Sequence, residues 1–225
     1  MKLAIDHLVI AAPDLESGTG HVADLLGIAP QGGGAHPRMA THNRVLGLFG
    51  GMYLEVIAID PAATAPDRPR WFGLDSDLMQ QRLRDGPFLA HWAARVERPA
   101  DLSRWQSQYP DRIAPAIPMD RGALHWRLTV PEDGSLPAWH GDAASAGEGL
   151  FPTLIQWDVA NHPGISLPRQ DLALRRLRGQ HPHAELLRQG LAWLGAAELI
   201  EIEQSDGPPQ LTADIDTPAG IKTLR

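Results

Sequence analysis

The sequence predicts an α+β fold in which one supersecondary unit, strand–helix–strand–strand–strand (βαβββ), occurs repeatedly. Two observations support this prediction. Short apolar segments of the kind found in strands are separated by turns rich in glycine and proline, with 22 Gly and 20 Pro in 225 residues. The same order of predicted elements then starts again near residue 87. Because 43% of the residues are apolar, the chain can bury a sizeable core.

The first predicted module covers residues 1–60. Its clearest strands are residues 3–11, 41–49 and 52–60, the last two joined by Gly50-Gly51 as in a hairpin. A helix is expected between Asp14, which suits an N-cap, and Gly27, which suits the residue after a helix C-terminus. The run Gly32-Gly33-Gly34 indicates a flexible turn.

A linker over residues 61–86, with a short helix at 75–85, leads to the second predicted module at 87–158. Its expected elements are a strand at 88–97, a helix at 100–109, and strands at 113–119, 123–131 and 150–158. Residues 132–149 between the last two strands are rich in Gly, Ala and Ser. They predict an insertion that acts as a lid or a mobile loop.

Residues 172–225 predict a C-terminal βαββ-like half-unit within the same compact body. Its expected elements are a strand at 172–177, a helix at 184–194, and short strands at 199–203, 211–215 and 221–224. This half-unit has no partner module in the sequence. Because an unpaired sheet edge favours association, we expect it to pack against the domain edge or to form a homodimer contact.

Composition excludes several classes of function. The net charge of -7 and the scattered Arg residues argue against nucleic-acid binding. The absence of cysteine excludes disulfides, thiolate zinc sites and cysteine nucleophiles. No apolar run reaches the ~18 residues of a membrane span, and Asp6-His7 interrupts any signal-peptide core, so a soluble cytoplasmic protein is expected.

Four short motifs resemble the glyoxalase-like domain family of the vicinal-oxygen-chelate (glyoxalase/bleomycin resistance/extradiol dioxygenase) superfamily. They are Ile5-Asp6-His7-Leu8-Val9-Ile10 followed by Asp14, Thr41-His42-Asn43-Arg44, Tyr53-Leu54-Glu55-Val56-Ile57 and Trp71-Phe72-Gly73. The resemblance extends over essentially the whole chain. It implies that the modules form a curved mixed β-sheet cup with flanking helices, and that the cup binds a divalent metal and a small molecule.

The resemblance also implies four metal ligands, from the first and last strands of each module. The first module offers His7 and Glu55. Laying residues 89–92 over 5–8 places His91 opposite His7, and laying 154–157 over 53–56 places Gln156 opposite Glu55. Such ligands suit zinc, iron, manganese or nickel. The neutral Gln156 weakens the set, and the alternative is a metal-free cup in which these residues hydrogen-bond to one another or to a ligand.

Strand alternation suggests which other side chains contact a substrate. In residues 124–130 the apolar side chains alternate with His125 and Arg127, which are therefore expected to face the cup, while Arg95 shares its face with His91. Guanidinium groups there favour an anionic ligand. The alternative is that they pair with Glu55, Glu97 or Asp158. The complete predicted substrate-binding set is His42, Asn43, Trp71, Arg95, His125 and Arg127.

Two functions follow from the resemblance. The first is a metal-dependent lyase, isomerase or dioxygenase that acts on a small anionic substrate, with Glu55 binding the metal and also moving a proton. The second is a metal-free protein that sequesters a small molecule, as in antibiotic resistance.

Overall fold

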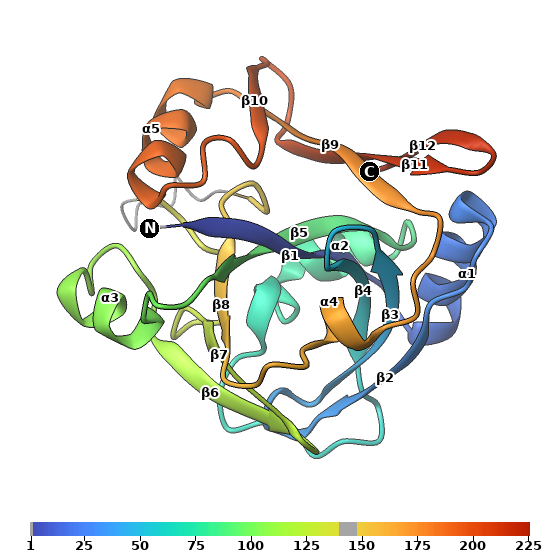
Figure 1. The fold of residues 1–225 in the computed structure, drawn as a ribbon, viewed down its shortest axis with the longest axis horizontal. Helices are drawn as coiled ribbons and strands as arrows, with labels where there is room; N and C mark the ends of the chain where they lie inside the picture. Colours follow the sequence, from blue (N-terminus) through green and yellow to red (C-terminus); the bar gives the residue numbers. More distant parts are fainter. Residues whose placement is uncertain (1, 140–147) are drawn as a thin grey trace.

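The computed structural model describes residues 2–139 and 148–225 (Figure 1). The lid or mobile loop expected over 132–149 lies in part outside the described residues, so only its two ends are considered. Within the described part of the chain, no helix is long and apolar enough to cross a membrane.

The first module folds as predicted at most of its elements. These are β1 (Leu3–Ala11), α1 (Leu15–Leu26), β2 (Gln31–His36), the 3-10 helix η1 (Pro37–Met39), β3 (Thr41–Leu48) and β4 (Met52–Ile59). Helix α1 begins where the Asp14 carboxylate accepts a hydrogen bond from the Ser17 amide at 2.8 Å, and it ends at Gly27, whose φ is 78°. The glycine run is part of strand β2 and not a flexible turn.

The second module repeats this order after a linker. Its elements are η2 (Trp71–Gly73), α2 (Asp77–Leu83), β5 (Phe88–Val96), α3 (Leu102–Gln108), β6 (Ala116–Arg121), β7 (Leu124–Thr129) and β8 (Thr153–Trp157). Helix α3 is capped by Asp101, which accepts from the Arg104 amide at 2.9 Å.

The two modules share one eight-stranded sheet with the order β2-β3-β4-β1-β5-β8-β7-β6. In each module the first strand pairs in parallel with the last, and β1 pairs antiparallel with β5 at the centre. The edge strands β2 and β6 approach each other, and Arg38 Nη1 donates to the Pro118 carbonyl at 2.9 Å across this gap (Figure 1). The sheet is therefore a nearly closed cup, which confirms the predicted α+β fold.

Both faces of this sheet are apolar. The concave face carries Val9, Ala93, Trp126, Leu128, Ile155 and Trp157. The convex face carries Leu8, Ile10, Trp92 and Leu154, which pack against the helices and the C-terminal unit. A sheet buried on both faces has no polar side to mark which residues point into the cup.

The C-terminal unit follows a short helix, α4 (Pro163–Ser166), and consists of β9 (Ala173–His181), α5 (Ala184–Leu194), β10 (Glu201–Gln204), β11 (Gln210–Thr217) and β12 (Gly220–Leu224). Its sheet has the order β10-β9-β11-β12, with β9 parallel to β10. The pairing therefore differs from that of the modules, whose first strand pairs with the last strand.

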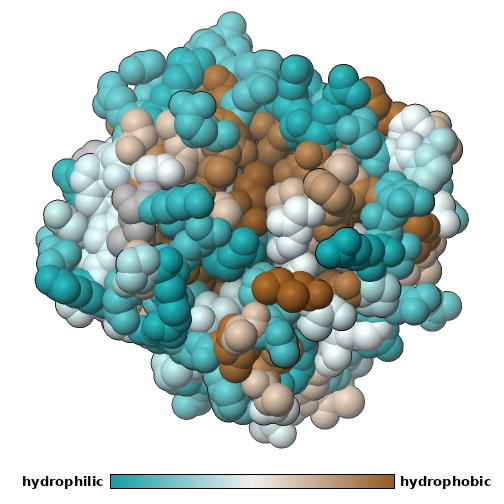
Figure 2. Space-filling model, in the orientation of Figure 1, coloured by the Kyte–Doolittle hydropathy of each residue, from teal (hydrophilic) through white to brown (hydrophobic). Residues whose placement is uncertain are grey.

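This unit lies on the convex side of the cup, across β1 and β5 (Figure 1). The Leu89 amide at the start of β5 donates to the terminal Arg225 carbonyl at 2.8 Å. A hollow remains between the unit and β1, where apolar side chains such as Leu3, Leu174 and Ile200 lie among charged ones such as Arg95, Arg176 and Glu198 (Figure 2). The chain thus covers much of its own convex face with the C-terminal unit.

Candidate functional site

A cluster of polar side chains lies inside the cup on walls that are otherwise apolar. Its members are Asp6, His7, His36, Asn43, Glu55 and Arg121, contributed by β1, β2, β3, β4 and β6. The first five are buried and Arg121 is half-buried. Polar groups removed from water are costly unless they bind partners, so their contacts define the site.

The centre of the cluster is one imidazole between two carboxylates. An irregularity in the β1–β5 pairing between Ile5 and His7 accompanies the burial of both Asp6 and His7. His7 Nδ1 lies 2.8 Å from Asp6 Oδ1, and His7 Nε2 lies 3.5 Å from Glu55 Oε2. Each ring nitrogen of His7 therefore faces a carboxylate, and a protonated ring can donate to both Asp6 and Glu55.

The charges of Asp6 and His7 support each other. Burial alone would raise the pKa of Asp6, but the hydrogen bond from His7 and the charges of His7 and Arg95 outweigh it and lower this pKa. Burial alone would lower the pKa of His7, but the Asp6 hydrogen bond and the Glu55 charge outweigh it and raise this pKa. The pair therefore favours a carboxylate beside an imidazolium.

A second chain of contacts joins Glu55 to the other module. Asn43 Nδ2 donates to Glu55 Oε1 at 2.5 Å, and Asn43 Oδ1 accepts from Arg121 Nη1 at 2.9 Å. His36 lies beside them, and burial lowers its pKa to about 4, so this imidazole is neutral at pH 7. Of the three side chains Arg121, Asn43 and His36, Arg121 is thus the one that carries a positive charge.

Aromatic side chains close the walls around the cluster. The Tyr53 ring stacks on His7 with the ring centroids 4.8 Å apart, and Trp71, Trp126 and Trp157 line the same space. The void left between them is about 30 Å³, which is room for about one water molecule. The cup is closed in this conformation.

The predicted substrate-binding residues divide into two groups. Asn43 and Trp71 line the cup. His42, Arg95, His125 and Arg127 do not line it: His42 is on the opposite face of β3 from Asn43, and His125 is exposed. Apolar Trp126 and Leu128 face the concave side instead, because the cup interior is apolar where the alternation argument assumed a polar surface.

The two predicted arginine clamps are held by carboxylates. Arg95 Nη1 lies 3.2 Å from Asp6 Oδ2, beneath the cluster. Arg127 Nη2 lies 3.0 Å from Asp158 Oδ1 and also bonds Gln156 on the outer side. Arg127 therefore pairs with a carboxylate of the protein, which was the alternative to its binding an anionic ligand. Arg95 contacts Glu97 as well, but its nearer partner is Asp6.

The four predicted metal ligands do not converge. His91 is on the concave side, but its Nδ1 faces the Gly149 carbonyl and its Nε2 accepts from the Thr153 amide at 3.1 Å. The Gln156 amide faces α3, where it accepts from the Leu102 amide at 3.0 Å and donates to the Ala100 carbonyl at 2.7 Å. Only His7 and Glu55 meet. Among the described residues, no group of three or more His, Cys, Asp and Glu side chains is placed to hold a metal ion.

Replacing His91 with glutamine is expected to reduce the pH dependence of the free energy of unfolding at acidic pH. Burial lowers the pKa of His91 to about 3 from 6.5 in the unfolded chain. At a pH between these two values His91 is protonated only in the unfolded chain, which favours unfolding. The free energy of unfolding therefore falls by about 1.4 kcal/mol per pH unit as the pH drops below 6.5. Urea unfolding of both proteins between about pH 7 and 4.5 measures the slopes. Equal slopes would contradict the assignment.

Several residues of the cup were not predicted as site residues: Asp6, His36 and Arg121 of the cluster, and Trp126 and Trp157 of the aromatic walls. Asp6 had a signal, since an acidic side chain interrupts the apolar run of β1. Arg121 had none, because its partner Asn43 belongs to the other module and is 78 residues away.

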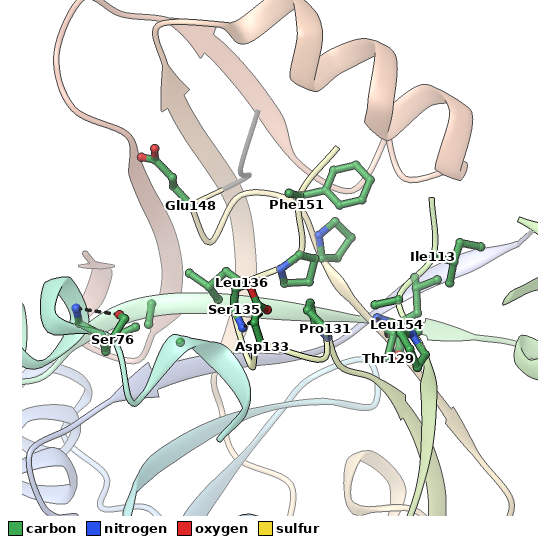
Figure 3. A pocket seen from close by; sticks show the side chains of 18 of the residues that line it. Ser76, Ile113, Thr129, Pro131, Asp133, Ser135, Leu136, Glu148, Phe151 and Leu154 are labelled. Atoms are coloured by element: carbon green, nitrogen blue, oxygen red, sulfur yellow. Dashed lines mark hydrogen bonds between the residues drawn. The ribbon is translucent and has the colours of Figure 1, made fainter. Parts of the chain in front are cut away.

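A larger hollow lies outside the cup, among α2, the end of β7 and the residues before β8 (Figure 3). Its volume is about 670 Å³, and prolines and apolar side chains such as Leu136, Phe151 and Leu154 form much of its wall. Asp133, which points into it, accepts from the Ser135 amide at 3.0 Å. No histidine is among its described lining residues. The imidazole between two carboxylates therefore lies in the cup and not in this hollow.

Comparison with known proteins agrees with the fold. The sequence model of a glyoxalase-like domain matches residues 5–195. A hypothetical protein from Staphylococcus aureus has a TM-score of 0.60 at 14% identity, over 97% of this chain and 82% of that one. Methylmalonyl-CoA epimerase from Mycobacterium tuberculosis has a TM-score of 0.43 at 16% identity, over 70% and 88%. No curated protein matches the sequence significantly. At 14% identity the Staphylococcus aureus structure bears on the fold and not on the activity.

Proposed function

Because the chain belongs to the glyoxalase-like domain family, we propose that the cup is the active site of an enzyme that moves a proton on a small molecule. Glu55 is the base and His7 is its cationic partner. The observation that supports this proposal is the buried line of Asp6, His7 and Glu55, with one imidazole between two carboxylates.

The expected chemistry is enolisation of a carbonyl compound. The Glu55 carboxylate takes a proton from the carbon next to the carbonyl, and the His7 Nε2–H group stabilises the oxygen that gains charge. Asp6 accepts from His7 Nδ1, which fixes the ring and favours its protonated form. Asn43 orients the Glu55 carboxylate through its amide. Of the activities that the family resemblance implied, this assignment corresponds to a lyase or an isomerase.

A substrate needs the cup to open, because the void of about 30 Å³ holds only about one water molecule. The side chains that close it include Trp71 from η2 and Pro163 from α4. His162, next to Pro163, stacks on Trp157 with the ring centroids 5.7 Å apart. We expect the segment that carries α4 to move away when a substrate enters.

Solvent deuterium exchange tests the proposal. A panel of small 2-oxo and 3-oxo acids is incubated with the protein in deuterated water, and proton NMR follows loss of the signal next to the carbonyl. Exchange by the wild-type protein that is lost in Glu55→Gln supports the proposal. Saturable binding of panel members without exchange would contradict it and favour the metal-free sequestering protein.

The family also implies a divalent metal, although no step above uses one. Elemental analysis of the purified protein before and after chelation measures it directly. If the wild-type protein and Gln156→Ala retain metal and His7→Ala loses it, the ion is bound by His7 without Gln156, and its ligands differ from the predicted four. Metal lost in Gln156→Ala would restore that set and contradict the placement of this amide against α3.

A further inference from the structure

We propose that Arg121 selects substrates that carry a carboxylate, which it binds together with the indole N–H of Trp71. This inference rests on the proposed function of the cup and names the substrate class. Arg121 is the last residue of β6, yet its side chain crosses to the first module and lines the same void as Glu55.

The guanidinium of Arg121 has unused donors. Its Nη1 bonds Asn43 Oδ1 at 2.9 Å and lies 3.3 Å from His36 Nε2. In the described part of the chain, its Nε and Nη2 groups have no hydrogen-bond acceptor, and no carboxylate lies within ion-pair distance of it. A half-buried cation of this kind is usually paired, so its free N–H groups indicate an anionic ligand.

The groups around Arg121 do not supply that anion. Glu55 Oε1 is bound by Asn43, whose amide separates the carboxylate from the guanidinium. His36 is neutral and is already in contact with Nη1. Asn43 therefore acts as a spacer that keeps the base and the cation apart while both face the void.

Trp71 adds a second unsatisfied donor. Its side chain is only 3% exposed, and its Nε1 has no hydrogen-bond partner among the described residues. A buried N–H without an acceptor costs about 1–3 kcal/mol, which a ligand oxygen would recover. Trp71 and Arg121 line one void. The flat aromatic walls of this void suit a planar carboxylate.

The glycine run of β2 gives Arg121 its path. A Cβ on Gly34 would lie 3.0 Å from Arg121 Cδ, so the arginine would have to shift by a few tenths of an ångström. Gly33 has a φ of 82°, and a Cβ there would lie 2.1 Å from the Asn43 carbonyl oxygen. We infer that the absence of a side chain at Gly34 leaves room for Arg121 to reach Asn43, while Gly33 allows β2 to pass close to the Asn43 backbone.

Ligand binding, measured by calorimetry and tryptophan fluorescence, tests the inference without requiring turnover. The probes are pyruvate and benzoate, their methyl esters, and inorganic phosphate. We expect the wild-type protein to prefer each carboxylate to its ester, and Arg121→Gln to lose about 10- to 100-fold in carboxylate affinity, which is the effect of one charge-assisted contact. Arg121→Lys should recover part of this loss.

Gly34→Ala provides a finer test, because it displaces a flexible side chain and its backbone does not need a positive φ. It should weaken carboxylate binding about tenfold, an effect of about 1.4 kcal/mol, while the melting temperature stays near that of the wild type. Gly20→Ala is the matched control, since nothing lies within 4 Å of its added Cβ.

Three results would overturn the inference: unchanged affinity in Arg121→Gln, equal affinity for acids and esters, or no carboxylate binding by the wild-type protein. Its failure is distinguishable from failure of the proposed function. Deuterium exchange that depends on Glu55 but not on Arg121 would remove only the carboxylate assignment. Binding that depends on Arg121, without any exchange, would remove only the enzyme assignment.

Discussion

Asp6→Ala is expected to lower the free energy of unfolding by about 3–5 kcal/mol, the usual effect of breaking a buried ion pair. Asp6 is fully buried and bonds three groups: His7 at 2.8 Å, Arg95 at 3.2 Å and the Trp157 indole N–H at 3.0 Å. Alanine would leave two cations and one donor without their acceptor. Urea unfolding at pH 7 measures the change.

Asp101→Ala is the matched control. Asp101 also pairs with an arginine, its Oδ1 lying 3.5 Å from Arg127 Nη1, but it caps α3 at the exposed surface, where its loss should cost about 1 kcal/mol. Asp6→Asn should lie between the two, because the amide oxygen can still accept from Trp157. If Asp6→Ala is no more destabilising than Asp101→Ala, the cluster does not hold a buried ion pair.

Glu55→Gln is expected to lower the rate of proton exchange by about 10²- to 10⁴-fold, the typical contribution of a positioned general base. Glutamine has nearly the same shape, and its amide oxygen can still accept from Asn43. It cannot take a proton, and its amide nitrogen cannot accept from His7. Initial rates of deuterium uptake at saturating substrate measure the loss in kcat, while unfolding curves check that the fold is intact.

Glu97→Gln is the control for this measurement. Glu97 is likewise a glutamate with charged partners, but it lies outside the cup: its Oε1 is 3.7 Å from Arg95 Nη2, and it pairs with Lys2 at the surface. Its replacement should leave the exchange rate within about twofold of the wild-type rate, since surface pairs contribute little. A Glu55→Gln protein with the same rate as Glu97→Gln would exclude Glu55 as the base.

Much of the fold followed from local signals. Asp14 and Gly27 set the ends of α1, and Gly50-Gly51 set the β3–β4 hairpin. These signals depend on residues close in sequence, so they act before any packing. The motif resemblance also placed His7, Asn43, Glu55 and Trp71 in one cup, and the structure brings these four together.

The placement of residues in the second module depended on packing. In β7 and β8 alternation shows which residues share a face, but it does not show which face is concave. Because apolar layers cover both sides of the sheet, burial does not distinguish them. Gln156 and Arg127 therefore lie on the outside, while Trp126 and Trp157 line the cup.

The sequence by itself determined most of the helices and strands, the repeat of the module and half of the cup's polar cluster, but not strand β2 or helix α4. Only the tertiary structure decided that Arg121 reaches Asn43, that Asp6 pairs with Arg95, and that the C-terminal strands pair differently from the modules. The physical reason is distance along the chain. Each of these contacts joins residues far apart in the sequence, and the contact of Arg121 with Asn43 also requires the edge strands β2 and β6 to approach each other.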